Sequence, residues 1–272
     1  QIKKRVLLVN DSLHFLDLES IRFNHKSDEI ILTSEGHINT KKSPSLFSIN
    51  ERGTIVRSFQ IPSAFHAESN QMPRHNGTLE GLSISCDRSG YWIAMELPLK
   101  GDGLEPEFRE TKSPVRITYL DDKTKKPQKQ FAYFLDPIAK NPNGNFAVNG
   151  LTDLIEYKKN VFIVIERSYS SGYENQGNTI KLYKVDSRKA SNTLGINSLK
   201  DNKFTPANKE LLLNLDDIRS ELTNNSIDNI EGITLGPKLS NGNSSLILVS
   251  DNNFNRMEKQ LNQFILLELI EN

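Results

Sequence analysis

The chain has 272 residues, of which 36% are apolar, and its 34 Lys and Arg residues equal its 34 Asp and Glu residues. This balance excludes a general cationic field for nucleic acid, and no apolar run approaches the roughly 18 residues that a membrane-spanning helix needs. The single cysteine, Cys86, excludes an intrachain disulfide and a cysteine-based zinc site. We therefore expect a soluble monomer that acts on a small molecule.

Short apolar runs rich in β-branched and aromatic residues recur between clusters of Asn, Asp, Gly, Ser and Pro, a pattern typical of strands joined by turns. In chain order the clearest runs are RVLLVN (5–10), EIILTSE (29–35), YWIAMEL (91–97), VFIVIER (161–167), TIKLYKV (179–185), SLILVSD (245–251) and QFILLEL (263–269). Residues 206–223 fit a short helix and a strand with a loop equally well. Trp92 is expected in the core.

An internal repeat indicates the fold. Four segments share a pattern of four positions: an apolar residue, a polar or acidic residue, a small or acidic residue, and a second apolar residue. They are LESI (18–21), LEGL (79–82), LTDL (151–154) and IEGI (230–233). A hairpin-length stretch that ends on an acid follows each segment. The resulting pairs are Glu19 with Glu35, Glu80 with Glu96, Asp153 with Glu166, and Glu231 with Asp251.

The innermost strands of a β-propeller line its central channel, so acids at one point of each repeat would converge there. The sequence therefore predicts an all-β fold, a single β-propeller over residues 1–272 with a central acidic cleft. Six blades of about 45 residues each fit the length, and five blades are the alternative. Strands 5–10 and 263–269 would pair to close the ring.

Seven of these segments, in this order, resemble the phytase-like domain family of bacterial β-propellers, also described as the esterase-like activity of phytase. They are RHNGTLEGLS (74–83), AMELPL (94–99), GLTDLIEY (150–157), IERSYSSG (165–172), IKLYKVD (180–186), DNIEGITLGP (228–237) and SDNNFN (250–255). The resemblance implies a propeller with a calcium-dependent or phosphoester-directed site, in a secreted or periplasmic setting. The chain begins at Gln1 without an initiator Met, so we expect that a signal peptide has been removed, with a lipid anchor as the alternative.

A cluster of carboxylates in a partly dehydrated channel is stable only if some groups are protonated or a cation is bound. Ligation by oxygen atoms alone suits calcium. The predicted calcium ligands are Glu35, Glu80, Glu96, Asp153, Glu166, Glu231 and Asp251, with Asn229 and Asn252 as further oxygen donors. The competing interpretation is that these acids accept hydrogen bonds from local turn amides.

The sequence predicts Glu80, Glu166 and His75 as catalytic residues, because a positioned carboxylate or imidazole can manage the proton of an attacking water. The predicted substrate-binding residues are Arg74, Arg167 and Asn76. Guanidinium groups can hold a phosphate through two parallel hydrogen bonds. The alternative role of Arg167 is an ion pair with a carboxylate of a neighbouring blade.

Motifs of serine hydrolases, zinc proteases and P-loop enzymes are absent from the sequence, so a serine hydrolase is not expected. The resemblance and the predicted acidic cleft imply a calcium-dependent hydrolase that acts at the central cleft on a phosphoester, with another ester or a lactone as the second choice of substrate. The alternative is a non-catalytic, calcium-stabilised propeller that binds a carbohydrate, a peptide or a phosphorylated ligand. Clustering of Arg74, Arg167, Lys100 and Arg109 at the cleft would favour an anionic substrate, whereas aromatic side chains at its mouth would favour a sugar or a peptide.

Overall fold

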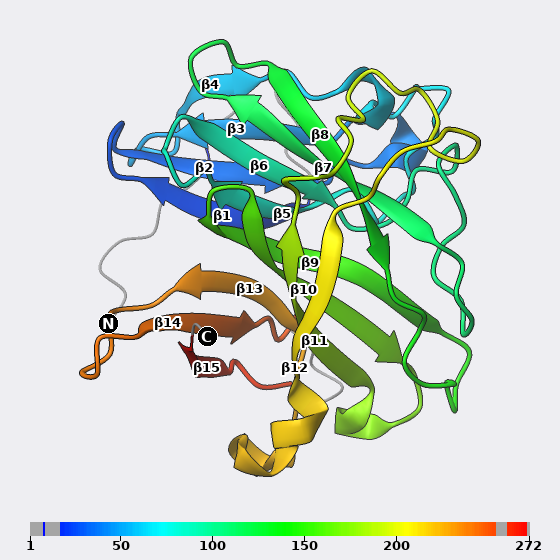
Figure 1. Ribbon diagram of the computed structural model, residues 1–272, viewed down its shortest axis with the longest axis vertical. Helices are drawn as coiled ribbons and strands as arrows, with labels where there is room; N and C mark the ends of the chain where they lie inside the picture. The colour runs from blue at the N-terminus through cyan, green and yellow to red at the C-terminus, as the bar shows by residue number, and fades with distance from the viewer. Residues whose placement is uncertain (1–7, 9–16, 254–259, 271–272) are drawn as a thin grey trace.

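The computed structural model describes residues 8, 17–253 and 260–270. These residues form four antiparallel sheets, shown in Figure 1, and no α-helix. The first sheet contains β1 (Leu18–Asn24), β2 (Glu29–Ser34), β3 (Ser45–Ile49) and β4 (Ile55–Phe59). The second contains β5 (Leu79–Ile84), β6 (Gly90–Met95), β7 (Ser113–Asp121) and β8 (Pro127–Leu135). The third contains β9 (Ala147–Lys158), β10 (Val161–Ser170), β11 (Asn178–Asp186) and β12 (Asn208–Asn214), and the fourth β13 (Ile230–Leu235), β14 (Ser244–Ser250) and β15 (Phe264–Leu269).

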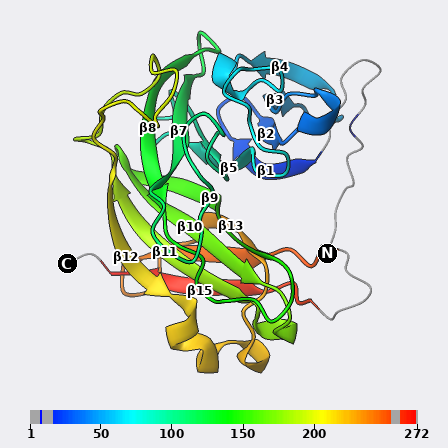
Figure 2. The same ribbon diagram turned by 90° about the vertical axis from the view of Figure 1, so that its right-hand side faces the viewer.

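The strands of each sheet follow one another in sequence order, and the first strand of each sheet is the innermost. Strand β5 contacts β1 on one side and β9 on the other, and β9 in turn contacts β13. Figures 1 and 2 show the sheets fanning outward from these first strands. The described residues therefore form a single all-β propeller with four blades.

The prediction of six or five blades is wrong. Each of the four repeated segments, at residues 18–21, 79–82, 151–154 and 230–233, lies in the first strand of one blade, and long connections such as 60–78 and 187–207 separate the strands. Dividing the length by a typical blade size therefore overestimated the number of blades. Residues 264–269 form β15 as expected. The predicted strand 5–10 lies outside the described residues except for Leu8, which packs on the first blade near Leu32 and Phe47.

Residues 206–223, for which helix and strand were equally expected, contain both. Residues 208–214 form β12, and 215–221 form a short 3₁₀ helix. The Asn214 side chain caps this helix by accepting a hydrogen bond from the main-chain amide of Asp216 at 3.2 Å. None of the helices in the described part of the chain has the length and apolar character that a membrane crossing requires.

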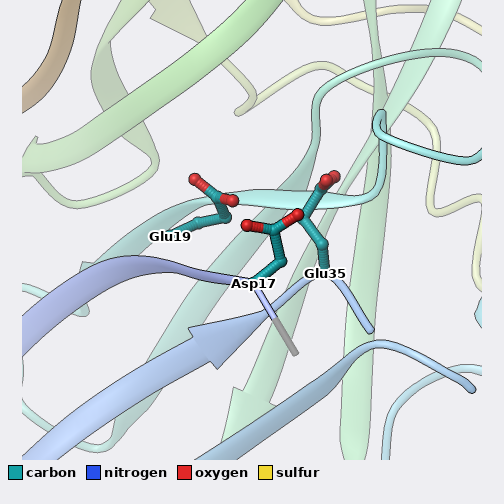
Figure 3. A group of neighbouring side chains, drawn as sticks. All are labelled: Asp17, Glu19 and Glu35. Carbon is teal, nitrogen blue, oxygen red and sulfur yellow. The ribbon is translucent and has the colours of Figure 1, made fainter. Parts of the chain in front are cut away.

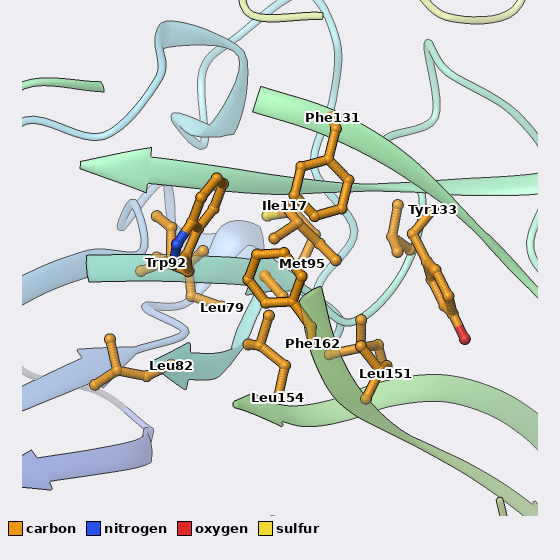
Figure 4. Packing of buried hydrophobic residues seen from close by; sticks show 14 of the residues in the cluster. Leu79, Leu82, Trp92, Met95, Ile117, Phe131, Tyr133, Leu151, Leu154 and Phe162 are labelled. Atoms are coloured by element: carbon orange, nitrogen blue, oxygen red, sulfur yellow. The ribbon is translucent and has the colours of Figure 1, made fainter. Parts of the chain in front are cut away.

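The apolar positions of the repeats hold neighbouring blades together. Leu79, Leu82 and Leu154 are fully buried in the largest core, together with the edge-to-face pair of Trp92 and Phe162, as Figure 4 shows. Trp92 is 3% exposed, which confirms its predicted place in the core. A second core joins the third and fourth blades. Shortening one of these leucines to alanine would cost roughly 2–5 kcal/mol.

The inner strand of every blade carries a β-bulge at the same point of its repeat. The extra residue lies at position 80, 152 or 231 in the last three blades and at 19 or 20 in the first. A bulge turns the side chains that follow it, and bulges are frequent next to functional sites. The residues paired immediately before the bulges are Leu18 with Ser34, Leu79 with Met95, Leu151 with Glu166, and Ile230 with Ser250.

The buried carboxylate of Asp153 connects all four inner strands. It accepts hydrogen bonds from the main-chain amides of Leu82 at 3.2 Å, Leu154 at 2.8 Å and Ile233 at 2.9 Å, which lie in β5, β9 and β13. Arg22 of β1 completes the set with an Nη2–Oδ2 distance of 2.7 Å. This contact set fixes the positions of the inner strands around the site described next.

Candidate functional site

The inner strands and the loops beside them enclose a cavity of about 490 Å³. Eight acidic side chains line it, and Arg167 is the only cation among the described residues that do so. The acids are Asp17, Glu19, Glu80, Glu96, Glu174, Asp228, Glu231 and Asp251. The other polar and aromatic lining residues are Asn76, Phe146, Tyr169, Asn178, Asn229, Asn253 and Gln260.

Two positions of the repeat supply most of the charged lining. One lies on the inner strand, at the second residue of each repeated segment. We call it the bulge position, and in the four blades it is Glu19, Glu80, Thr152 and Glu231. The other lies near the end of the second strand, one residue after the residue that pairs with the start of the repeated segment. We call it the hairpin-end position, and it is Glu35, Glu96, Arg167 and Asp251. The third blade thus supplies a threonine and an arginine where the other blades supply acids.

Three predicted calcium ligands, Glu35, Asp153 and Glu166, are not lining residues of the cavity, although Glu35 lies within 4.8 Å of Glu80 and Glu96. Asp153 and Glu166 stand one residue away from the two repeat positions: Asp153 follows the bulge position, and Glu166 precedes Arg167. Neighbouring residues of a strand point to opposite faces, so a shift of one residue turns a side chain away from the cavity. The structure therefore does not bring these two acids together with the others.

Glu166 is buried among donors from the second and third blades. Its carboxylate accepts hydrogen bonds from the Tyr133 hydroxyl at 2.5 Å and from Asn149 Nδ2 at 2.8 Å, and it forms an ion pair with Lys209. The Asp136 main-chain amide donates a further bond of 3.0 Å. All of these partners are protein groups, which fits a structural role better than the predicted catalytic one.

Five carboxylates lie close together at the first and second blades. The oxygens of Asp17, Glu19 and Glu35 lie within 4.8 Å of one another, as do those of Glu35, Glu80 and Glu96. Figure 3 shows the first three carboxylates turned toward one another. Because Glu35 belongs to both groups, the five form one continuous set, which we call the carboxylate cluster. Glu35, Glu80 and Glu96 are buried.

Burial and mutual repulsion make the charged state of this cluster costly. Desolvation by burial, followed by the nearby Glu35 and Asp17, raises the pKa of Glu19 to about 8. Burial also raises the pKa of Glu96 to about 8, although Arg167 opposes this shift. The pKa of Glu80 lies well above its usual value for the same reasons, burial first and the charge of Glu96 next. At neutral pH the cluster must therefore retain protons or bind a cation.

Arg167 lies between the cluster and the fourth blade. It forms an ion pair with Glu231 of β13, and its Nη2 lies 3.8 Å from Glu96 Oε1. Burial opposes the positive charge of Arg167, but Glu231 and Glu96 together raise the pKa of its guanidinium. The expected alternative for Arg167, an ion pair with a carboxylate of a neighbouring blade, is confirmed.

The loop before β5 places its three predicted residues differently. Asn76 lines the cavity. Arg74 is not a lining residue, because it donates to the carbonyls of Pro98 at 2.9 Å and Gly103 at 3.0 Å and pairs with Glu105 at 2.6 Å. His75 is exposed beside His37, with ring centroids 4.3 Å apart, and is also outside the lining.

The four cations whose clustering would favour an anionic substrate, Arg74, Arg167, Lys100 and Arg109, are dispersed, because only Arg167 lines the cavity. Arg109 bonds to its neighbour Glu107 at 3.1 Å, and neither Arg109 nor Lys100 lines the cavity. Phe146 and Tyr169 line it instead, with ring centroids 6.2 Å apart. Sequence reasoning missed these two aromatic residues and Asp17, because none of them stands at the bulge or hairpin-end position.

The carboxylate cluster fits a hard divalent cation. Its ligand atoms are all oxygens, three of its members are buried, and no histidine or cysteine belongs to either group of potential ligands in the described residues. Calcium takes about six to eight oxygen ligands, and carboxylates can each supply one or two. A bound cation would also remove the repulsion that raises the pKa values of Glu19, Glu80 and Glu96.

The fold and the cavity define a four-bladed β-propeller whose cavity is lined by carboxylates. The family model described as phytase-like, esterase-like activity of phytase, matches residues 1–254, and the chain belongs to this family. No curated protein matches the chain. One similar solved structure is described as the structure of the Dos1 propeller, with 11% sequence identity and a TM-score of 0.33. The match covers 86% of this chain and 52% of that one, so the chain spans about half the length of that structure.

Proposed function

We propose that this protein is a calcium-dependent hydrolase of phosphoesters and works outside the cytoplasm, in a secreted or periplasmic setting. The observation that supports the reaction is the carboxylate cluster, whose oxygens lie within 4.8 Å of one another in two overlapping groups, beside a cavity containing Arg167. Membership of the phytase-like family fits a hydrolase. The substrate would be a single phosphate ester rather than a polyanion, because eight acids surround one arginine.

The carboxylate cluster would hold the ion. Bound calcium supplies a Lewis acid that polarises a phosphoryl oxygen. Glu35, Glu80 and Glu96 provide buried oxygens, and Asp17 and Glu19 provide more accessible ones toward the cavity. Glu80 is held by the inner strand β5, whereas Glu35 and Glu96 directly follow β2 and β6. The Thr78 main-chain amide donates to Glu35 Oε1 at 2.5 Å.

Arg167 would position the phosphoryl group. Its Nη1 already contacts Asn229 and Glu231, whereas among the described residues its Nη2 makes only the longer contact of 3.8 Å with Glu96 Oε1. This leaves donor capacity for an anionic oxygen, and hydrogen bonds between charged partners are the stronger ones. Glu231 would accept the proton of the attacking water, because it lines the cavity and its side chain remains 26% exposed.

Release of phosphate from p-nitrophenyl phosphate tests this function. We expect calcium-dependent turnover that falls at least a hundredfold in Glu231→Gln, since a positioned base contributes about 10²–10⁴-fold. Glu107→Gln is the matched control, because Glu107 pairs with Arg109 outside the cavity. Equal turnover with and without calcium, or full activity of Glu231→Gln, would exclude the proposed roles.

The dispersed cations and the two aromatic lining residues favour a second candidate function. In it the protein binds a carbohydrate or a peptide, and calcium only stabilises the propeller. Arg74 is bound to Glu105, whereas Phe146 and Tyr169 face the cavity. Calcium binding without release of phosphate from any ester would support this candidate over the first.

A further inference from the structure

The two sides of the cavity differ in chemistry. The first and second blades contribute the carboxylate cluster. The third and fourth contribute a surface of aromatic rings and amides together with Arg167 and four acids, Glu174, Asp228, Glu231 and Asp251. We call this surface the amide–aromatic side. Its defining residues are Phe146, Tyr169, Asn178 and Asn229.

Two of the acids on the same side, Asp228 and Asp251, accept hydrogen bonds from local main-chain amides. Asp228 accepts hydrogen bonds from the main-chain amides of Asn229 at 2.9 Å and Leu261 at 2.5 Å. Asp251 accepts a bond of 3.1 Å from the amide of Asn253. These contacts are ordinary turn chemistry, and the Asn229 side chain is already bonded to Arg167 and Glu231. Asn178 and the two aromatic rings are therefore among the groups that remain available to a ligand on this side.

Asn178 has a buried side-chain oxygen, Oδ1, that lacks a hydrogen-bond partner among the described residues. The residue is 7% exposed, begins β11 and lines the cavity. Buried side-chain oxygens in native proteins nearly always accept a hydrogen bond, so each exception needs an explanation. A ligand in the cavity that donates a hydrogen bond to this oxygen would explain the exception.

Arg167 has a donor that lacks an acceptor among the described residues, and it lies two residues from Tyr169, the residue that pairs with Asn178. On the paired strands β10 and β11, Arg167 faces Ile180 while Tyr169 faces Asn178. The Nε of Arg167 is a buried donor without a partner in the described part of the chain. An unpartnered acceptor and an unpartnered donor thus lie near each other on adjacent strands.

Hydroxyl groups meet both needs, because each hydroxyl donates one hydrogen bond and accepts others. A phosphate dianion only accepts, and an ammonium group only donates. Several hydroxyls on one ligand could therefore satisfy Asn178 and Arg167 together. A phosphorylated polyol without free hydroxyls could not.

The aromatic residues fit the same ligand. Phe146 is 57% exposed although it lines a cavity, and its ring lies 6.2 Å from that of Tyr169 at an interplanar angle of 42°. Aromatic faces carry negative charge density, whereas the C–H bonds on the face of a sugar ring are slightly positive. The two rings thus offer an apolar platform beside hydrogen-bonding groups, which is the usual composition of small-molecule sites.

We propose that the amide–aromatic side binds a neutral carbohydrate ring, with Asn178 and Arg167 on its hydroxyls and Phe146 against its face. This inference rests on the proposed function only in naming the sugar as the part of the substrate remote from the reacting ester. Binding of the sugar itself requires neither calcium nor turnover.

Calorimetric titration tests the subsite with neutral disaccharides of gluco, galacto, manno and xylo configuration, in EDTA and in calcium. At least one disaccharide should bind in both conditions. Phe146→Ala should weaken it at least tenfold. Phe108→Ala is the matched control, since Phe108 is 52% exposed and lies outside the lining, and should bind as the parent does.

Asn178→Leu separates a binding role from a structural one. Removing a buried amide whose oxygen is unpartnered should leave the unfolding midpoint unchanged or higher while binding falls at least tenfold. A lower midpoint with intact binding would overturn the assignment of Asn178.

Failure of the subsite and failure of the hydrolase are distinguishable. If calcium shifts the unfolding midpoint but no disaccharide binds, the carbohydrate proposal is overturned and the calcium site stands. If a disaccharide binds in EDTA and calcium has no effect, the subsite stands and the calcium-dependent hydrolase does not.

Discussion

Two buried carboxylates on adjacent inner strands, Asp153 and Glu80, have opposite surroundings. Asp153 receives three main-chain amides and Arg22, so protein donors from all four blades meet its charge. Glu80 lies among other carboxylates, and burial together with the charge of Glu96 raises its pKa. The first arrangement stabilises the fold without a ligand, whereas the second is stable only with protons or a cation.

The difference arises because the two acids stand one residue apart within the repeat, and neighbouring residues of a strand point to opposite faces. Glu80 occupies the bulge position of its repeat, and Asp153 occupies the next position. The same offset of one residue separates Arg167, which lines the cavity, from Glu166, which is buried among Tyr133, Asn149 and Lys209. A repeat can therefore supply either a structural or a ligand-binding acid, depending on which face its side chain reaches.

Breaking the Asp153 contacts should have the largest effect. In Asp153→Ala the guanidinium of Arg22, whose side chain is 15% exposed, and three main-chain amides lose their carboxylate acceptor, which should lower the free energy of unfolding by roughly 3–5 kcal/mol. Urea unfolding checks this. Asp153→Asn keeps one acceptor oxygen, so its free energy of unfolding should lie between those of the parent and the alanine variant. A parent-like midpoint in Asp153→Ala would contradict the structural role.

The metal-free protein should lose stability as the pH rises. Glu19 and Glu96 have folded pKa values of about 8, above their usual value of 4.5, so the folded state binds more protons between these limits. Stability is then full below about pH 4.5 and declines up to about pH 8, by up to about 1.4 kcal/mol per pH unit for each extra proton held. Urea midpoints in EDTA from pH 5 to 9 measure the slope. A flat or rising profile would show that these carboxylates are already ionised.

Glu166→Gln sharpens the contrast between structural and cavity acids. It removes the charge that Lys209 and the Tyr133 hydroxyl contact, so unfolding should become easier by roughly 1–3 kcal/mol. Its response to calcium should equal that of the parent, because Glu166 does not line the cavity. Loss of the calcium response in a folded Glu166→Gln protein would restore the predicted ligand role.

Glu80→Gln should have the smallest and opposite effect. Replacing a buried carboxylate that repels Glu96 by a neutral amide should stabilise the metal-free protein at pH 8 by about 1 kcal/mol, or about 2–4 °C in the unfolding midpoint. Differential scanning calorimetry measures the change, with Glu107→Gln as the exposed control. A lower midpoint in EDTA would mean that Glu80 makes a stabilising contact as an anion.

The sequence predicted the inner strands well because the repeats combine apolar residues with hairpin-length spacing. Glu80, Glu96, Glu231 and Asp251 line the cavity as that pattern suggested. Asp153 was misplaced because a β-bulge changes the face of the residues beside it, and a bulge leaves no clear mark in one sequence.

The other differences come from parts of the chain outside the repeats. Phe146 and Asn178 lie at the beginnings or approaches of strands in the third blade, where no repeated residue marks the cavity. The number of blades was overestimated because long connections lengthen each blade beyond the usual size.

Thermal unfolding of EDTA-stripped protein, titrated separately with calcium and magnesium, tests the central claim most directly. A ligand that binds only the folded state raises the midpoint with concentration. We expect a calcium-selective rise that disappears in the Glu80→Gln, Glu96→Gln double variant and persists in Glu107→Gln. No rise with calcium, or an equal rise in the double variant, would contradict the assignment of the carboxylate cluster as a metal centre.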